Sequence, residues 1–334
     1  MLFDAIGPDG QRKLLASRAV LIGCGALGTV VANTLVRAGV GVLRICDRDF
    51  IEKDNLQRQI LFDEEDIAAN LPKAQAAATK LSRINRDVFI EPIVRDVNHT
   101  NIENLVEGFD LILDGTDNFE TRFLINDLCV RDRRPWIYGA VIGSTGLCLT
   151  IVPYETPCLR CVFEEAPPPE MNPTCDTAGV LASAVNVVAS LQAVEAIKLL
   201  IGRREQINRH LVHCDVWEGR FLNMNVQGAF DQGDCPCCRR RDFPYLEGRL
   251  ASTSSALCGR NAVQISAAAA GPVNLPAMAD KLRSVAAGVS FNEYLLKARI
   301  ETFDMTLFAD GRAIIKGTDN ADKARGLYAK YLGA

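Results

Sequence analysis

The glycine motif GCGALG, from Gly23 to Gly28, constrains the fold of this chain more than any other feature of the sequence. It follows the apolar run RAVLI of residues 18–22, and a helix-compatible stretch to Ala38 and a second apolar run, VLRIC, come after it. Glycines between a strand and a helix let the backbone approach a phosphate at the helix N-terminus. Asp47 ends the second run, where a ribose-hydroxyl acceptor is expected. The pattern predicts a nucleotide site; a tight turn without a ligand is the alternative.

Further strands and helices alternate along the first part of the chain. The segment PKAQAAATKLSRI predicts a helix that begins near Pro72 and is capped by Asn70. Buried strands are predicted at residues 88–94, 111–114, 136–140 and 146–152. Strands that alternate with helices favour an α/β fold, a Rossmann-like and mainly parallel sheet with helices on both faces.

The remaining segments predict one more core helix and a second domain. Residues 164–174 carry four prolines and predict a loop, and residues 182–201 are apolar on nearly every side, as in a buried or interface helix. A membrane span is the competing interpretation of that helix. The Ser/Thr-rich stretch LASTSSAL predicts a linker, so we expect domains at 1–244 and 245–334. In the smaller, α+β domain we expect helices at 275–285 and 322–332 and a hairpin around 309–311, but no catalytic motif.

Composition narrows the classes of function. The net charge is −4, and the arginine cluster at residues 239–241 is brief, which argues against a nucleic-acid partner. Three histidines offer little material for acid–base relays. The sequence shows no signal-peptide pattern, and most of its twelve cysteines stand singly in apolar segments, so a reducing, cytoplasmic location without membrane attachment is expected.

Charged and amide side chains follow the expected ribose acceptor in the segment DRDFIEKDNLQRQ. Lys73 adds a positive charge at a helix start, and DGTDN places Asp117 after a strand, at the ligand edge of the sheet. This set suits a triphosphate with magnesium and is not needed by a dehydrogenase. A solvated loop is the alternative for any one of these residues, and an NAD-dependent oxidoreductase is the rival enzyme class.

Two CxxC motifs predict a metal site. Four thiolates from two such hairpins form a closed tetrahedral zinc site, which is structural because it leaves no open position. The expected ligands are Cys158, Cys161, Cys235 and Cys238. A redox CxxC is the alternative, and Cys237 is the spare thiol. Cys175 stands apart at the start of a long helix, where the helix dipole can favour a thiolate.

Together these segments resemble the ThiF/MoeB/HesA family of enzymes that activate ubiquitin-like proteins. The resemblance rests on nine segments in family order across residues 6–239: GCGALG, DRDFIEKDNLQRQ, NLPKAQAA, LDGTDNFETR, WIYGAVIGSTG, CLRC, TCDTAGVL, SLQAVEAIKLL and CPCC. The C-terminal stretches LCGRNAVQI and FADGRAIIKGTDN are similar to the extension of the longer ThiF proteins of thiamine synthesis.

The resemblance implies ATP-dependent adenylylation of the C-terminal glycine of a ThiS-like or MoaD-like sulfur carrier that ends in Gly-Gly. It implies that Asp117 holds magnesium, and that Cys175 joins a later sulfur transfer, with a donor such as a cysteine desulfurase. The expected catalytic residues are Arg58, Lys73, Asp117 and Cys175. The expected nucleotide-binding residues are Gly23, Gly25, Gly28, Asp47, Asp49, Asn55, Arg58, Gln59, Lys73 and Asp117.

One departure qualifies the expected activity. Family members begin with an arginine-rich segment of the form RYxRQ that reaches across a homodimer to the partner's ATP, whereas this sequence starts at Met1-Leu2-Phe3. The resemblance implies a homodimer here as well. MoeB-type activation for molybdopterin synthesis and a zinc-stabilised docking protein that has lost turnover are the alternatives to a ThiF-type enzyme.

Overall fold

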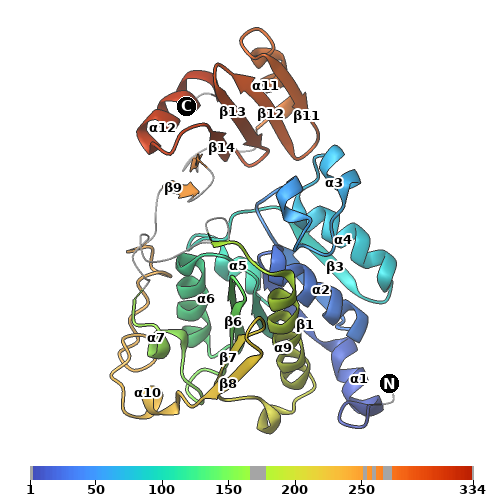
Figure 1. Ribbon diagram of the computed structural model, residues 1–334, viewed down its shortest axis with the longest axis vertical. Coiled ribbons are helices and arrows are strands. Elements are labelled where there is room, and N and C mark those ends of the chain that lie inside the picture. The colour runs from blue at the N-terminus through green and yellow to red at the C-terminus, as the bar shows by residue number, and fades with distance from the viewer. Residues whose placement is uncertain (1–2, 166–177, 251–253, 258–260, 266–272, 333–334) are drawn as a thin grey trace. The chain divides into compact units, whose positions relative to one another are not determined.

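The computed structural model describes residues 3–165, 178–250, 254–257, 261–265 and 273–332. These residues divide into two compact units, 1–251 and 252–334, each with its own sheet. Figure 1 shows both units and the course of the chain through them.

An eight-stranded sheet with the order β3-β2-β1-β4-β5-β6-β7-β8 forms the centre of the first unit. Strands β1 to β5 pair in parallel, and β6, β7 and β8 extend the sheet in antiparallel fashion. The mainly parallel part confirms the predicted Rossmann-like arrangement. The strands are β1 (Arg18–Ile22), β2 (Val42–Cys46), β3 (Phe89–Ile93), β4 (Leu111–Asp114), β5 (Trp136–Ile142), β6 (Thr145–Ile151), β7 (Leu211–Asp215) and β8 (Arg220–Met224).

The register of the parallel strands brings the carboxyl ends of β1, β2 and β4 to one edge of the sheet. Ile22 pairs with Cys46 on one side and with Asp114 on the other. The residues that follow these three therefore begin side by side: the glycine turn, Asp47 and the loop that carries Asp117. In an open α/β sheet this edge, where the strand order reverses, is where ligands bind.

Helices cover both faces of this sheet (Figure 1). On one face α1 (Gly7–Ala16), α2 (Ala26–Ala38), α4 (Lys73–Ile84) and α9 (Ala182–Leu200) bury one apolar cluster. On the other face α5 (Ile102–Val106), α6 (Phe119–Asp132) and α7 (Leu159–Val162) bury a second cluster with the cysteine hairpins. The shorter helices are η1 (Lys53–Asn55), α3 (Glu64–Ala68), η3 (Arg204–Gln206) and α10 (Gln227–Asp231).

Helix α9 is long and apolar enough to cross a membrane by length and composition alone. In the structure it packs on the sheet, and Val185, Val188 and Ala189 are buried in the first apolar cluster. Its polar Gln192 and Glu195 are also buried and bond to strand residues, Gln192 to the carbonyl oxygen of Asp114 and Glu195 to the hydroxyl of Thr150. These contacts are those of a core helix, as the sequence predicts.

The helix predicted from Pro72 begins as expected, but its predicted cap is wrong. Asn70 lies in the left-handed region at φ 50°, and Pro72 is itself the N-cap residue, without a side-chain cap. The backbone N–H of Lys73, in the first turn, instead donates to the carbonyl oxygen of Asp49 at 2.9 Å. A tertiary contact thus satisfies the N–H group that the Asn70 side chain was expected to bind.

The second unit is an antiparallel six-stranded sheet with the order β11-β12-β13-β14-β10-β9. Its apolar cluster lies between the sheet and helices α11 (Leu275–Leu282) and α12 (Ala321–Leu327), and a π-helical turn spans Tyr328–Leu332. The predicted 309–311 hairpin joins β13 (Phe303–Phe308) to β14 (Ala313–Lys316). The other strands are β9 (Ser254–Leu257), β10 (Ala262–Ile265), β11 (Gly288–Phe291) and β12 (Leu295–Ile300). Strand β9 lies inside the segment predicted to be a linker. This segment forms a strand because it pairs with β10, despite its serine-rich composition.

Candidate functional site

The glycine turn after β1 is built for close approach of backbone to backbone. Gly23 has φ +89°, a conformation that favours glycine, and its N–H donates to the carbonyl oxygen of Cys46. A Cβ on Gly28 would overlap the carbonyl oxygen of Gly23, and one on Gly115 would meet the same oxygen. Gly25 is the N-cap of α2, so the turn presents the start of that helix at the ligand edge, as the motif predicts.

Asp47 ties the glycine turn to the end of β2. Its Oδ2 accepts the backbone N–H of Cys24 at 2.6 Å, and its Oδ1 accepts that of Asp49 at 2.7 Å. Burial raises the pKa of this carboxyl group, and the charge of Lys73 and the two N–H groups oppose the rise. Asp47 is therefore a structural acceptor in this structure, and its contact with a ribose stays a prediction.

Alternating charges run along the strand edge beside Asp47. The ammonium of Lys73, which is 4% exposed, lies 3.2 Å from Oδ2 of Asp49. The guanidinium of Arg48 lies 3.9 Å from Oδ1 of Asp49 and 2.8 Å from Oδ1 of Asp96. Asp49 thus holds the Lys73 ammonium at the helix start beside the glycine turn. This geometry suits a lysine that meets phosphates, because its position is set before a ligand arrives.

The segment after Asp49 carries three further predicted site residues, which differ in burial and in their hydrogen-bond partners. Asn55 is 1% exposed, and its side-chain amide bonds within the segment, to the N–H of Glu52 and to Asp54. Arg58 is half-buried and donates to the carbonyl oxygen of Asp54. Gln59 is 4% exposed, and its Nε2 lies 4.0 Å from where a Cβ on Gly25 would be.

Gln59 is the member of this segment that points to a ligand most directly. Its buried Oε1 has no hydrogen-bond partner among the described residues. A buried amide oxygen without a partner costs free energy unless a ligand or water supplies a donor. Its position beside Gly25 therefore fits an amide that meets a ligand in the glycine turn.

The loop after β4 holds one exposed and one buried carboxylate. Asp117 is exposed, whereas the Asp114 side chain is fully buried and forms an ion pair of 3.1 Å with Arg122. Burial raises the pKa of Asp114, and Arg122 opposes that rise. The sequence pointed to Asp117 but did not reveal the contact between Asp114 and Arg122. An arginine within the first turns of a helix that follows a strand end was the available signal.

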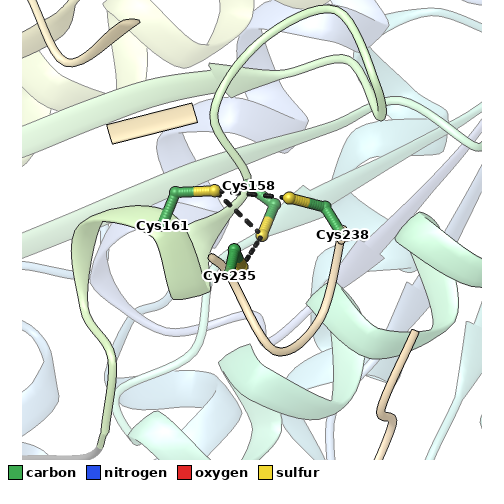
Figure 2. A group of neighbouring side chains, drawn as sticks. All are labelled: Cys158, Cys161, Cys235 and Cys238. Atoms are coloured by element: carbon green, nitrogen blue, oxygen red, sulfur yellow. Dashed lines mark hydrogen bonds between the residues drawn. The ribbon is translucent and has the colours of Figure 1, made fainter. Parts of the chain in front are cut away.

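The four predicted metal ligands meet in one cluster (Figure 2). The sulfur atoms of Cys158 and Cys235 lie 3.6 Å apart, and Cys161 lies 3.7 Å from Cys158 and 3.5 Å from Cys238. Sulfurs bound tetrahedrally to zinc at about 2.3 Å lie about 3.8 Å apart, far from the bonding distance of about 2.05 Å in a disulfide. The donor set and its spacing therefore fit a four-coordinate soft metal ion.

The remaining cysteines divide into buried thiols and two residues, Cys175 and Cys258, that lie outside the described part of the chain. Cys24, Cys46, Cys129, Cys148 and Cys214 are free and buried. Cys237 is also buried and free. Cys175 lies outside the described residues, as does most of the predicted proline-rich loop.

Comparisons with known proteins find similar chains over most of this sequence. The sulfur carrier protein ThiS adenylyltransferase of Bacillus subtilis (strain 168) is 44% identical over 332 residues, which cover 99% of this chain and 97% of that protein. The Escherichia coli (strain K12) protein of the same name is 41% identical over 239 residues, 71% of this chain and 92% of that protein. A crystal structure of E. coli MccB with ATP matches with a TM-score of 0.57 at 25% identity, over 66% of this chain and 67% of that chain.

A family model gives the assignment. The ThiF family model matches residues 1–237, which include the glycine turn, the loop that carries Asp117 and the cysteine hairpins up to Cys237. The relatives above add sequence identity well over 30% across most of their own length. The chain belongs to the ThiF family.

Proposed function

We propose that this protein adenylates the C-terminal glycine carboxylate of a ThiS-like, ubiquitin-like sulfur carrier with ATP, for synthesis of the thiamine thiazole. The observation that carries the proposal is the meeting of the glycine turn, Lys73 and the Asp117 loop at one strand edge. The likeness to the B. subtilis enzyme, which extends over both units of this chain, supports the ThiS-like carrier.

The reaction needs placement of charge more than acid–base groups. A carboxylate oxygen of the carrier attacks the α-phosphorus of ATP, the bond to the β-phosphate oxygen breaks, and pyrophosphate leaves with that electron pair. Lys73 and Arg58 would lie against the phosphates, and the side-chain amide of Gln59 would meet the nucleotide beside Gly25. Asp117 would bind magnesium, which offsets the charge that builds on the departing phosphates.

The cysteine cluster would hold one structural zinc ion. Its ligands come from two hairpins 77 residues apart, so the ion would tie two distant segments of the first unit together. With four thiolates bound, zinc has no position for substrate and contributes stability.

The β7–β8 hairpin carries a candidate surface for a partner protein. Trp217, Phe221 and Leu222 are 77%, 60% and 53% exposed on an edge strand and its turn. Phe221 and Leu222 are consecutive in β8 and face opposite sides of the strand, so the hairpin exposes apolar side chains on both of its faces. We assign this surface to the carrier, and we also propose a homodimer, a cytoplasmic location, and a cysteine desulfurase as sulfur donor.

A molybdopterin-type carrier is the second candidate partner, and an adenylation assay separates the two. Purified protein is mixed with MgATP, labelled pyrophosphate and either a ThiS-like or a MoaD-like carrier ending in Gly-Gly, and exchange into ATP is measured with mass spectrometry of the acyl-adenylate. We expect exchange with the ThiS-like carrier and none with a carrier that lacks its last glycine. ATP binding without exchange on either carrier would favour the docking protein, and binding of NAD in place of ATP would favour the oxidoreductase.

A further inference from the structure

The loop that carries Asp117 is held by a buried ion pair to which the proposed chemistry gives no role. Asp114 ends β4, Asn118 is the N-cap of α6, and the loop between them is three residues long. The Asn118 side chain accepts the N–H of Thr121, so the helix end of the loop is capped. The strand end is where the ion pair lies.

The carboxylate of Asp114 holds the loop through hydrogen bonds to Thr116. Its Oδ1 accepts both the backbone N–H and the hydroxyl of Thr116, at 2.8 and 2.7 Å. Its Oδ2 accepts Nε of Arg122 at 3.1 Å. Gln192 of α9 bonds the backbone carbonyl oxygen of Asp114 at 2.8 Å, so both the side chain and the main chain of this residue are held.

Arg122 bonds the carbonyl oxygen of the same residue, Thr116. Asp114 and Arg122 together form the frame that holds the loop. Its Nη2 donates to the carbonyl oxygen of Thr116 at 2.8 Å and to that of Gly139, on β5, at 3.2 Å. Its guanidinium lies 5.5 Å from the ring centre of Phe119 and 5.3 Å from that of Tyr138. Thr116 therefore has its N–H, its hydroxyl and its carbonyl oxygen engaged, directly before Asp117.

The chemistry of the pair indicates a purpose other than stability. Removing two charges from water costs more than their attraction returns in many proteins, and apolar residues of similar volume serve stability as well or better. A planar guanidinium with donors in a fixed fork can reach a carboxylate and two carbonyl oxygens together, whereas the point charge of a lysine cannot. The hydrogen bonds of Arg122 therefore fix the orientation of the peptide group that precedes Asp117.

We propose that Asp114 and Arg122 are positioning residues that hold the Asp117 carboxylate where the magnesium of MgATP binds. The inference takes its ligand, MgATP, from the proposed function, and it adds a separate prediction about magnesium binding. Loss of the frame should weaken magnesium binding in the nucleotide complex, and not merely the fold.

Arg44 offers a matched control for Arg122. It forms an ion pair with Glu91 at 2.7 Å, donates to the carbonyl oxygen of Leu105 at 2.8 Å and lies 4.4 Å from the ring centre of Phe109. These are the same three kinds of contact, made to β3, α5 and the residues just after α5, away from the Asp117 loop. Arg44→Lys should therefore lose comparable packing without touching that loop.

The test compares Arg122→Lys, Arg44→Lys and the wild type in ATP binding followed by calorimetry over a range of magnesium concentrations, and in pyrophosphate exchange. We expect Arg122→Lys to raise the magnesium concentration at half-saturation about tenfold, since a misplaced ligand group costs of this order, with partial rescue of exchange at high magnesium. Arg44→Lys should stay within about twofold of the wild type. Thr116→Val, which removes only the hydroxyl bond to Asp114, keeps the test available if Arg122→Lys does not fold, and should shift the half-saturation in the same direction by less.

The outcomes for the two proposals are distinct. Equal magnesium dependence in Arg122→Lys and Arg44→Lys, with Thr116→Val matching the wild type, would overturn the positioning role while leaving adenylation intact. A wild type that binds MgATP but shows no exchange with any carrier would overturn the proposed function, while the binding titration still decides the positioning role. A wild type without magnesium-dependent ATP binding would overturn both.

Discussion

The side-chain amide of Asn126, on α6, donates to the sulfur of Cys237 at 3.2 Å, inside the second cysteine hairpin. Its carbonyl oxygen accepts the N–H of Leu159, inside the first hairpin, at 2.8 Å. One fully buried asparagine therefore bonds both hairpins of the four-cysteine cluster. Groups that orient metal-bearing segments in this way affect metal affinity as well as the fold.

Asn126→Leu should loosen both hairpins. The substitution keeps a similar volume but leaves the N–H of Leu159 buried without an acceptor, a loss of about 1–3 kcal/mol. We expect a lower urea midpoint and faster zinc release to a chromophoric chelator. Asn33→Leu, at a partly exposed asparagine that bonds Arg37 on α2, is the control and should change neither. Unchanged zinc release in Asn126→Leu would show that the hairpins hold the ion without this residue.

Metal analysis of the purified, reduced protein should find one zinc per chain. Cys158→Ser should lower the zinc content and the melting temperature more than it lowers ATP binding, because a structural metal contributes folding free energy. Cys237→Ser should keep its zinc, since Cys237 lies in the second hairpin but outside the four-sulfur cluster. Zinc lost equally from both variants would contradict the assigned ligand set.

Asp117→Ala and Arg58→Ala should each slow pyrophosphate exchange by about a hundredfold with the fold intact. Oriented charges in such sites contribute about 3 kcal/mol each to the barrier. Arg86→Ala, at an exposed arginine just after α4, controls for general loss of positive charge and should retain full exchange. Activity close to the wild type in both site variants would remove the basis for the assigned phosphate and magnesium contacts.

The stability that Asp127 contributes should fall as pH rises from about 4 to 7. Burial raises the pKa of this carboxyl group to about 7, and its Oδ2 accepts the N–H of Tyr245 at 3.0 Å. The unfolded chain releases this proton near pH 4 and the folded chain only near pH 7, so the contribution is complete below pH 4 and is lost as pH passes 7.

The matched variant for this slope is Asp127→Asn, which cannot ionise. The difference in melting temperature between Asp127→Asn and the wild type should shift in favour of the variant between pH 5 and pH 8. A difference that stays constant over this range would assign the slope to other groups.

Cys175→Ser should retain pyrophosphate exchange and lose a later sulfur-handling step. The sequence places this cysteine before a helix, and adenylation itself needs no thiol. Exchange and thiocarboxylate formation on the carrier, measured together by mass spectrometry, separate the two steps. An equal loss of both would place Cys175 in the adenylation chemistry.

Features that depend on neighbouring residues in the chain could be predicted before the structure was known. The glycine turn from Gly23, the start of α4 near Pro72 and the apolar strands follow from local spacing and residue type. The two CxxC motifs predicted one cluster because four soft ligands rarely occur in two pairs for another reason. The family resemblance rested on the same local strings.

Contacts between residues far apart in the chain could be identified from the folded structure alone. The Arg122–Asp114 pair, the bonds from Asn126 to both hairpins and the role of Asp49 in holding Lys73 join segments whose separation carries no periodic signal. The wrong cap at Asn70 has the same cause, since an N–H group donates to whichever acceptor the folded chain brings to it. The pairing of β1, β2 and β4 aligns the ends of these strands, and the packing of helices on the sheet brings the other partners together, so these contacts depend on the whole fold.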